Sequence, residues 1–371
     1  MAERYDVIVV GGGAMGTAAA WNLARRGRRT LVLERFGFGH AEGSSGGPTR
    51  IFRYVYDVPH YAAMAVQAHG PWAELQDASG VELLRMTGGL DLDRVPSAAE
   101  ALASVGVAFE LLSGAAANER WPSLRLSATA QALFQADGGV LRAADTVTAL
   151  ARLAGSAGAT LLEDTTVDAV RLSEDGVEIR TGGGDVYRAP VAVIAAGPWA
   201  AGLLHGAGID LALQPSQEQV SYFVLEHPAP MPTLIDWGAE PRTPPYLVPD
   251  PWEPGHFKVG LHRSGPPVDP DAPRLAIDEE RLERVRGYVA ARIAPHRDLE
   301  RTDTCRYTNT PDEDFVLDRS GPLVIASPCS GHGFKFVPLM GIAIADLATG
   351  AEPPFPLGPF RADRASLHEP V

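Results

Sequence analysis

The chain has 371 residues, more than one small hydrophobic core needs and enough for two domains. Its 32 Lys and Arg residues are outnumbered by 46 Asp and Glu residues, and the formal net charge of -14 disfavours nucleic acid and anionic membrane surfaces as partners. The two cysteines, Cys305 and Cys329, are too few for a disulfide framework, although their number allows one disulfide. They are also too few for a zinc site, and we expect no metal.

The first elements of the chain form one βαβ unit. Tyr5 to Val10 is an apolar, β-branched run typical of a buried parallel strand. Met15 to Arg26 then predicts a helix that ends at Gly27. Thr30 to Leu33 predicts a second strand, and Glu34 follows it directly.

Three glycines lie between the first strand and the helix. Gly11, Gly13 and Gly16 fit the pattern G-x-G-x-x-G, which lets the backbone approach a pyrophosphate at a helix N-terminus. Glu34 stands eighteen residues after Gly16, about where an acid binds ribose hydroxyls. This acid disfavours NADP, whereas the motif does not separate NAD from FAD. One alternative is a glycine-rich turn without a ligand, and another is a dinucleotide-binding module that has no catalytic role.

Further along the chain the pattern changes to short strands. Val167–Leu172 and Val177–Thr181 predict a β-meander. Val191–Ala195 predicts another buried strand, and it ends near Gly197.

The C-terminal half begins with a proline-rich segment, residues 226–255, which predicts long ordered loops that shape a pocket with Trp237 and Trp252. Asp278 to Ile293 predicts an amphipathic helix, and Pro353 to Pro359 predicts a loop-like tail.

The sequence also predicts where the protein resides. Its start leads directly into the glycine-broken strand and has no pattern of a secretory signal. The longest other apolar stretch, about Val191 to Leu204, is too short to span a bilayer. We therefore expect a cytoplasmic protein without a membrane partner.

Several motifs, in a fixed order along the chain, resemble those of the monomeric sarcosine oxidase and N-methyltryptophan oxidase family. They are the segments 43–53 (GSSGGPTRIFR), 120–122 (RWP), 138–141 (GGVL), 257–262 (FKVGLH), 305–312 (CRYTNTPD) and 330–336 (SGHGFKF). The last two together are quite specific, and the set covers nearly the whole chain.

The resemblance implies an α/β fold: a Rossmann-type FAD-binding domain with a second α+β substrate domain that contains a mixed or antiparallel sheet. It places the discontinuous FAD-binding domain at residues 1–86, 138–215 and 313–371. The substrate domain would comprise residues 87–137 and 216–312.

The resemblance also implies roles for individual residues. Cys305 matches the cysteine that links covalently to the flavin, Arg53 and Lys335 match the pair that clamps the substrate carboxylate, and Lys258 matches the lysine that activates oxygen. The matching pocket residues near the amine are Tyr246, His262 and Tyr307. The residues expected to contact FAD, besides Gly11, Gly13, Gly16 and Glu34, are Ser44, Thr49, Arg50, Gly197, Cys305, Gly331, His332, Gly333 and Lys335.

Each of these side chains also has a plainer interpretation. Cysteine is normally a small buried hydrophobe, and Cys329, where the family has no attachment site, is assigned to packing. Arg53 could form an ordinary salt bridge, and an exposed lysine such as Lys258 is usually inert. A lysine held beside a dry flavin would instead stabilise the superoxide that the first electron transfer to oxygen generates.

These observations predict a flavin-dependent oxidase that acts on the secondary amine of a small amino acid, either an N-methyl amino acid such as sarcosine or a cyclic imino acid. Its partners would be the amino acid and O₂, with H₂O₂ as a product, and the protein would be a monomer. The alternative within flavin chemistry is an amine dehydrogenase that passes electrons to a carrier instead of oxygen.

Overall fold

The computed structural model describes residues 4–368. Its strands are β1 (Val7–Val10), β2 (Thr30–Leu33), β3 (Thr49–Phe52), β4 (Leu84–Met86), β5 (Gly89–Leu92), β6 (Glu110–Ser113), β7 (Gln131–Gln135), β8 (Gly139–Arg142), β9 (Thr160–Leu162), β10 (Val167–Ser173), β11 (Gly176–Thr181), β12 (Val186–Ala189), β13 (Val191–Ile194), β14 (Gln214–Val224), β15 (Thr233–Asp236), β16 (Pro245–Pro249), β17 (His256–Leu261), β18 (Arg301–Asn309), β19 (Val316–Ser320) and β20 (Leu323–Ser327).

The α-helices are α1 (Ala14–Ala24), α2 (Pro59–Ser79), α3 (Val95–Ser104), α4 (Gly114–Arg120), α5 (Ala143–Ser156), α6 (Ala200–Gly206), α7 (Glu279–Arg292) and α8 (Val337–Thr349). Short 3₁₀ turns are η1 (Gly197–Trp199), η2 (Phe334–Phe336), η3 (Gly358–Phe360) and η4 (Ala365–His368).

A six-stranded sheet contains the predicted βαβ unit. Its order is β19-β20-β13-β1-β2-β9, and every neighbouring pair except β19 with β20 is parallel. Because successive side chains of a strand point to opposite faces, Val7 and Val9 pack in one hydrophobic cluster with helices α1, α5 and α8. Ile8 and Val10 pack in another cluster, on the face that carries the β-meander β10-β11-β12. The predicted meander and the strand that follows it are confirmed.

An eight-stranded mixed sheet forms the other large layer, in the order β18-β14-β17-β16-β15-β5-β7-β6. Only the pair β15–β5 is parallel. Val285 and Val289 of α7 pack against this sheet, and the side chain of Asp278 caps that helix by accepting a hydrogen bond from the Arg281 N–H at 3.1 Å. The predicted helix is thereby confirmed.

The prediction of loops over residues 226–255 is wrong in part, because β15 and β16 both lie in this segment. Proline fits there because Pro245 and Pro249 form the two ends of β16, where a missing N–H costs least.

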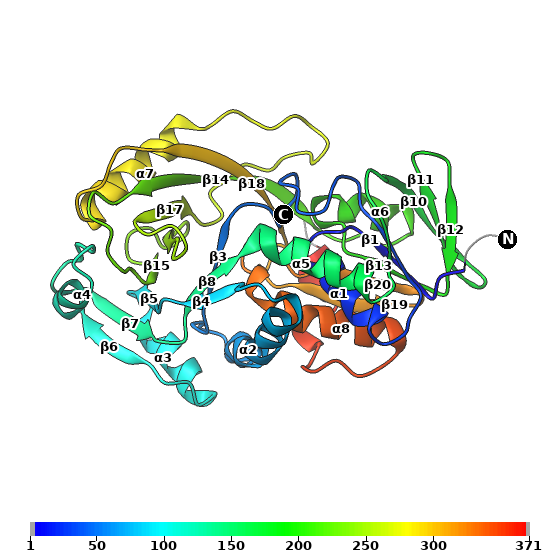
Figure 1. Cartoon of the computed structure of the whole chain (residues 1–371), viewed down its shortest axis with the longest axis horizontal. Helices are drawn as coiled ribbons and strands as arrows, with labels where there is room; N and C mark the ends of the chain where they lie inside the picture. The colour runs from blue at the N-terminus through cyan, green and yellow to red at the C-terminus, as the bar shows by residue number, and fades with distance from the viewer. Residues whose placement is uncertain (1–3, 369–371) are drawn as a thin grey trace.

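Figure 1 shows how the layers are arranged. The eight-stranded sheet, with α4 and α7, lies toward one end of the long axis, and the six-stranded sheet, with α1 and α8, lies toward the other. The small sheet β3-β8-β4 lies between them. The predicted α/β fold with a second, mixed sheet is therefore confirmed. Among the described residues, no helix has the length and apolar character needed to cross a membrane. The residue boundaries of the two domains stay a prediction.

Candidate functional site

A cavity of about 1670 Å³ lies where the sheets meet. Its volume exceeds the roughly 300–1,000 Å³ of ordinary small-molecule sites, so it has room for a dinucleotide and a substrate together. Most of the predicted site residues line it, although they come from distant parts of the chain: Gly11, Gly13, Glu34, Ser44, Arg50, Arg53, Gly197, Tyr246, Lys258, His262, Cys305, Tyr307, Gly331, His332, Gly333 and Lys335. Trp237 also lines the cavity.

The glycine-rich turn opens one end of the cavity onto the N-terminus of α1. Gly11 has φ +100°, and a Cβ there would lie 2.5 Å from the carbonyl oxygen of Ala195. Gly16 does not line the cavity: a Cβ on it would lie 1.8 Å from the carbonyl oxygen of Gly11. This glycine allows helix and turn to pack closely, and its contact with the cofactor stays a prediction.

Glu34 is buried at the end of β2, beside this turn. Its Oε2 accepts a hydrogen bond from the N–H of Gly12 at 2.6 Å, and its Oε1 accepts one from the N–H of Phe36 at 2.8 Å. The carboxylate is therefore fixed on the cavity wall, where the fingerprint of dinucleotide-binding folds places a ribose.

Arg50 organises the loop that follows. Its guanidinium donates to the carbonyl oxygens of Ser44 at 3.2 Å, Gly46 at 2.5 Å and Thr49 at 2.9 Å. The Ser45 hydroxyl accepts the N–H of Ala14 at 3.0 Å, which ties this loop to the start of α1.

Lys258 projects from the middle of β17 and is 4% exposed. Its Nζ donates to the carbonyl oxygen of Thr49 at 2.6 Å, a neutral partner rather than a carboxylate. Burial, and secondly the charge of Arg50, lower the pKa of Lys258 to about 7. Thr49, predicted to contact the cofactor, is not on the cavity wall, and its carbonyl instead holds the lysine.

Arg53 and Lys335 both contact Tyr56. The Arg53 guanidinium lies 4.8 Å from the centre of the Tyr56 ring, and Lys335 Nζ donates to the Tyr56 hydroxyl at 2.8 Å. Lys335 Nζ also donates to the carbonyl oxygen of His332 at 2.7 Å. Burial, and secondly Arg53, lower the pKa of Lys335 well below its usual value, as expected for two cations that share one dry region.

Arg53 also forms an ion pair, which the sequence allowed as its plainer role. Its Nη1 lies 2.9 Å from Asp91 Oδ1. Asp91 and Tyr56 are cavity residues that the sequence reasoning missed. The available signal for Asp91 was an acid in the otherwise apolar strand Gly89–Leu92.

The remaining pocket residues surround the segment Ser330–Phe336. Gly331 has φ +78°, and a Cβ on it would lie 2.3 Å from the Tyr307 ring and 2.7 Å from the His262 ring. His262 is buried, and burial followed by the charge of Arg263 lowers its pKa to about 3. This imidazole is therefore neutral near pH 7.

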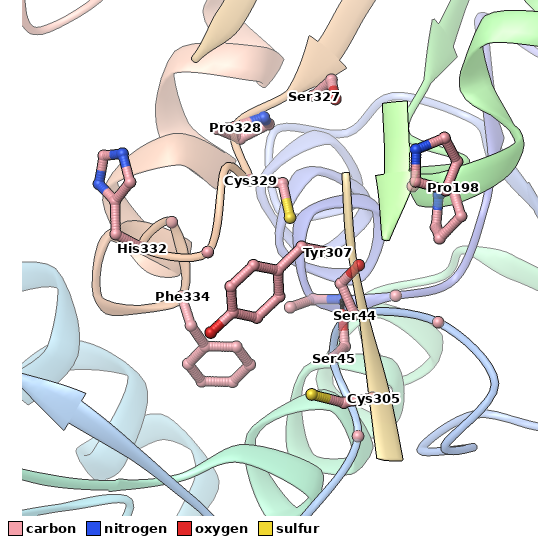
Figure 2. Close-up of a pocket in the computed structure, with 18 of the residues that line it drawn as sticks. Ser44, Ser45, Pro198, Cys305, Tyr307, Ser327, Pro328, Cys329, His332 and Phe334 are labelled. Carbon is pink, nitrogen blue, oxygen red and sulfur yellow. Dashed lines mark hydrogen bonds between the residues drawn. The ribbon is translucent and has the colours of Figure 1, made fainter. Parts of the chain in front are cut away.

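His332 is held by its surroundings. Its ring nitrogens lie 3.1 Å from the Tyr56 hydroxyl and 3.1 Å from the carbonyl oxygen of Glu313. Figure 2 shows its ring directed away from Tyr307 and Cys305. His332 also lines the cavity, and its contact with the flavin stays a prediction.

Both cysteines lie on the cavity wall and neither forms a disulfide. Cys305 and Tyr307 are two residues apart on β18, so their side chains share a face, as Figure 2 shows. Burial raises the pKa of Cys305, whereas the charges of Arg50 and Lys258 lower it. The Sγ of Cys329 accepts the N–H of Thr308 at 3.3 Å. The assignment of Cys329 to packing is thus incomplete, because this thiol reaches the cavity as well.

Trp252, in contrast, is not a cavity residue. Its indole N–H donates to Glu82 at 2.8 Å, and its ring packs on the guanidinium of Arg142 at 4.4 Å. The prediction that Trp252 shapes the pocket is wrong, because its side chain contacts Glu82 and Arg142 instead.

The residues present fit FAD. The glycine turn leaves no room for a side chain, Glu34 stands at the ribose position, and the cavity continues from there to the cationic residues. The FAD dependent oxidoreductase family matches residues 6–347. Monomeric sarcosine oxidase of Arthrobacter sp. strain TE1826 is 31% identical, and the alignment covers 99% of this chain and 98% of that protein.

Two further proteins are similar over the full length. N-methyl-L-tryptophan oxidase of Salmonella newport strain SL254 is 30% identical, with 98% of this chain and 100% of that protein covered. The solved structure of NikD, described as an unusual amino acid oxidase essential for nikkomycin biosynthesis, superposes with a TM-score of 0.89 at 29% identity and full coverage of both chains. The resemblance found in the sequence motifs is confirmed, and this chain belongs to the family of FAD-dependent oxidoreductases.

Proposed function

We propose that this protein oxidises the secondary amine of a small amino acid, an N-methyl or cyclic one, and returns the electrons to oxygen. One observation carries this proposal: Arg53 and Lys335, from distant parts of the chain, both contact Tyr56 and line the same cavity as Lys258. The relatives named sarcosine oxidase and N-methyl-L-tryptophan oxidase support an amino acid with a substituted nitrogen.

Bound FAD would supply the redox chemistry, accepting a hydride from the substrate C–H bond and passing the electrons to oxygen, with H₂O₂ released. The chain's own residues bind and orient. Arg53 offers a planar donor fork and Lys335 a compact charge for the substrate carboxylate. Their positive charge favours the neutral form of the substrate amine, which is the form that reacts. The neutral His262 adds no charge and serves as a wall with Tyr307 and Tyr246.

Lys258 favours oxygen as the electron acceptor. Its ammonium is buried, and its hydrogen-bond partner is a neutral carbonyl oxygen rather than a carboxylate. Because burying a charge without an opposite charge costs free energy of folding, a lysine in this position points to a functional role. We further propose that Cys305 holds the flavin covalently and that the protein works as a monomer, as its relative monomeric sarcosine oxidase does by name.

A substrate screen on the purified yellow protein tests the proposal. N-methyl and cyclic amino acids are added without oxygen, and bleaching of the flavin absorbance is recorded. Air is then admitted and peroxide is measured. We expect bleaching by at least one secondary amino acid, followed by peroxide. Bleaching without peroxide would favour the dehydrogenase alternative. A colourless protein, or a flavin that no amino acid bleaches, would contradict the proposal.

A further inference from the structure

Asp91 is an acid that lies directly beside the proposed carboxylate clamp. It projects from β5, is 3% exposed and lines the cavity. Its Oδ1 accepts a hydrogen bond from Arg53 Nη1 at 2.9 Å and a second from the indole N–H of Trp237 at 3.2 Å. Both bonds end on the same oxygen. Among the described residues, no donor reaches Oδ2.

Burial raises the pKa of Asp91, and the cations and the hydrogen bond around it oppose that rise without cancelling it. The Arg53 guanidinium contacts Asp91, and the charges of Lys335 and Arg94 also act on it. The Arg94 guanidinium lies 4.1 Å from the centre of the Trp237 ring and fixes the indole that donates to Asp91. An ion pair with two good hydrogen bonds is the ordinary way in which a buried carboxylate is tolerated.

The charges of the clamp can then be counted. A bound substrate carboxylate favours the charged form of Lys335, so Arg53 and Lys335 then count as two positive charges. Asp91, which is paired with Arg53, counts as one negative charge in the same dry region. One carboxylate of a substrate is enough to balance what remains. A second carboxylate would have no cation left and would lie near the carboxylate of Asp91.

We propose that Asp91 is a specificity-determining residue that restricts the clamp to substrates with a single carboxylate. Dicarboxylic amino acids, such as N-methylaspartate, are excluded by repulsion rather than by size. The inference rests on the proposed function, since it takes Arg53 and Lys335 as the carboxylate site. Asp91 is given no part in proton transfer. The proposal does not depend on which amine is oxidised.

The first experiment uses the wild-type holoprotein and simple acids of matched length. Propionate and malonate, and then butyrate and succinate, are titrated near neutral pH, and binding is measured by calorimetry and by the shift of the flavin absorbance. Like charges about 6 Å apart at an effective dielectric of about 20 weaken binding by roughly tenfold to a hundredfold. We therefore expect each dicarboxylate to bind at least about tenfold more weakly than its monocarboxylate partner.

The outcomes separate this inference from the proposed function. If the monocarboxylates bind and the dicarboxylates bind equally well or better, the inference is overturned while the clamp stands. If neither acid binds, the clamp itself is overturned and the inference fails with it. The wild-type measurement does not depend on the folding of any variant.

Two substitutions at Asp91 then test the charge. Asp91→Asn keeps the size and removes the charge, so the ratio of dicarboxylate to monocarboxylate affinity should rise by at least about tenfold. Asp91→Glu keeps the charge and should retain the wild-type discrimination, which a purely structural role would not predict.

Asp57→Asn is the matched control. It also removes a carboxylate that pairs with an arginine on the cavity wall, Arg94 at 3.4 Å, but these side chains are 38% and 47% exposed, whereas those of Asp91 and Arg53 are 4% and 12% exposed. Solvent screens such a pair, so the ratio should stay within about twofold of wild type. An equal change in Asp57→Asn and Asp91→Asn would overturn the proposal, because general electrostatics would then explain both.

Discussion

At the scale of single residues, Lys258 combines a buried ammonium with a neutral hydrogen-bond partner. A fixed cation about 4 Å from a developing negative charge, at an effective dielectric of about 20, contributes about 4 kcal/mol. Lys258→Met should therefore slow the reoxidation of reduced flavin by oxygen by about two to three powers of ten. Reduction by the amino acid should change little. Stopped-flow measurements of the two half-reactions check both statements, and equal slowing of both would contradict the role of Lys258.

Two controls accompany that variant. Lys258→Arg keeps the positive charge and should retain most of the oxygen reactivity. Thermal unfolding of Lys258→Met should not occur at a markedly lower temperature, because burial disfavours the ammonium in the folded state and Arg50 Nη1 still donates to the Thr49 carbonyl at 2.9 Å.

The pKa of Lys258 also predicts a pH dependence. The side chain is charged below its pKa of about 7 and neutral above it. The rate of oxygen reduction should therefore fall as pH rises through about 7. Negative charge on a bound flavin raises this midpoint and leaves the sign unchanged. The wild-type reoxidation rate is measured from acid to alkaline pH. A profile that is identical in Lys258→Met would show that another group titrates.

The two cysteines give a prediction with an internal control. Both line the cavity, but only Cys305 lies at the position that the family resemblance assigns to flavin attachment. Burial raises the pKa of the Cys305 thiol, and the charges of Arg50 and Lys258 oppose that rise. Cys305→Ser should release all its flavin when the protein is precipitated with acid, whereas Cys329→Ser should keep the flavin in the pellet. The absorbance of the supernatant distinguishes them. Release from Cys329→Ser alone would move the attachment site to Cys329.

At the scale of elements, the sequence predicted those whose pattern is local. The βαβ unit, the meander and the helix beginning after Asp278 each carry their own periodicity or cap, and the structure has them. Strands β15 and β16 were missed because prolines hide the alternation of side chains. Their pairing with β5 and β17 comes from tertiary contacts that no local pattern encodes.

The same limit applies to the candidate site. Motif residues such as Arg53, Lys258 and Lys335 were placed correctly on the cavity, because the family resemblance fixes them. Asp91 was missed because its place in the site follows from hydrogen bonds with Arg53 and Trp237, which lie far away in the sequence. Gly16 and Thr49 were assigned to the cofactor, which stays a prediction, and their contacts within the chain are with neighbouring backbone and with Lys258.

Gly16 in α1 offers a test at this scale. A Cβ at this position would meet the Gly11 carbonyl oxygen at 1.8 Å, a backbone atom that has no room to move away. Gly16→Ala should therefore distort the turn and lower the flavin content of the purified protein severely. Gly287→Ala is the matched helical control, since no atom outside its own helix backbone and chain neighbours lies within 4 Å of a Cβ at this position in α7. It should keep full flavin content and add about 0.5–1 kcal/mol of stability. Normal flavin content in Gly16→Ala would contradict the role given to this turn.

At the scale of the whole molecule, the site exists only because separate sheets meet. The Lys258 bond to Thr49 joins the eight-stranded sheet to the small sheet, and the Arg53–Asp91 pair spans residues 38 positions apart. The predicted division into a discontinuous FAD-binding domain and a substrate domain would place the cavity between two domains, which is a common location for cofactor sites.

Two loops close this cavity, residues 36–48 and 264–278, and neither contains a helix or a strand. Arg274 links them by donating to the carbonyl oxygen of Ala41. Asp271 also forms an ion pair, at 2.5 Å, with Arg35, which directly precedes the first loop. Segments with few internal hydrogen bonds open at low free energy, so a ligand that contacts them should protect them most.

We therefore expect that removing the flavin from Cys305→Ser raises amide hydrogen exchange in these two loops by at least about tenfold. Exchange in β17, which is buried and paired on both sides, should change much less. Mass spectrometry of the stripped and the flavin-reloaded protein measures this, and reloading provides the control for damage during stripping. If the sheets are already folded without flavin and the flavin orders only the two loops, hydrogen exchange should rise in those loops alone. A uniform rise that includes β17 would instead show that the flavin holds the sheets together.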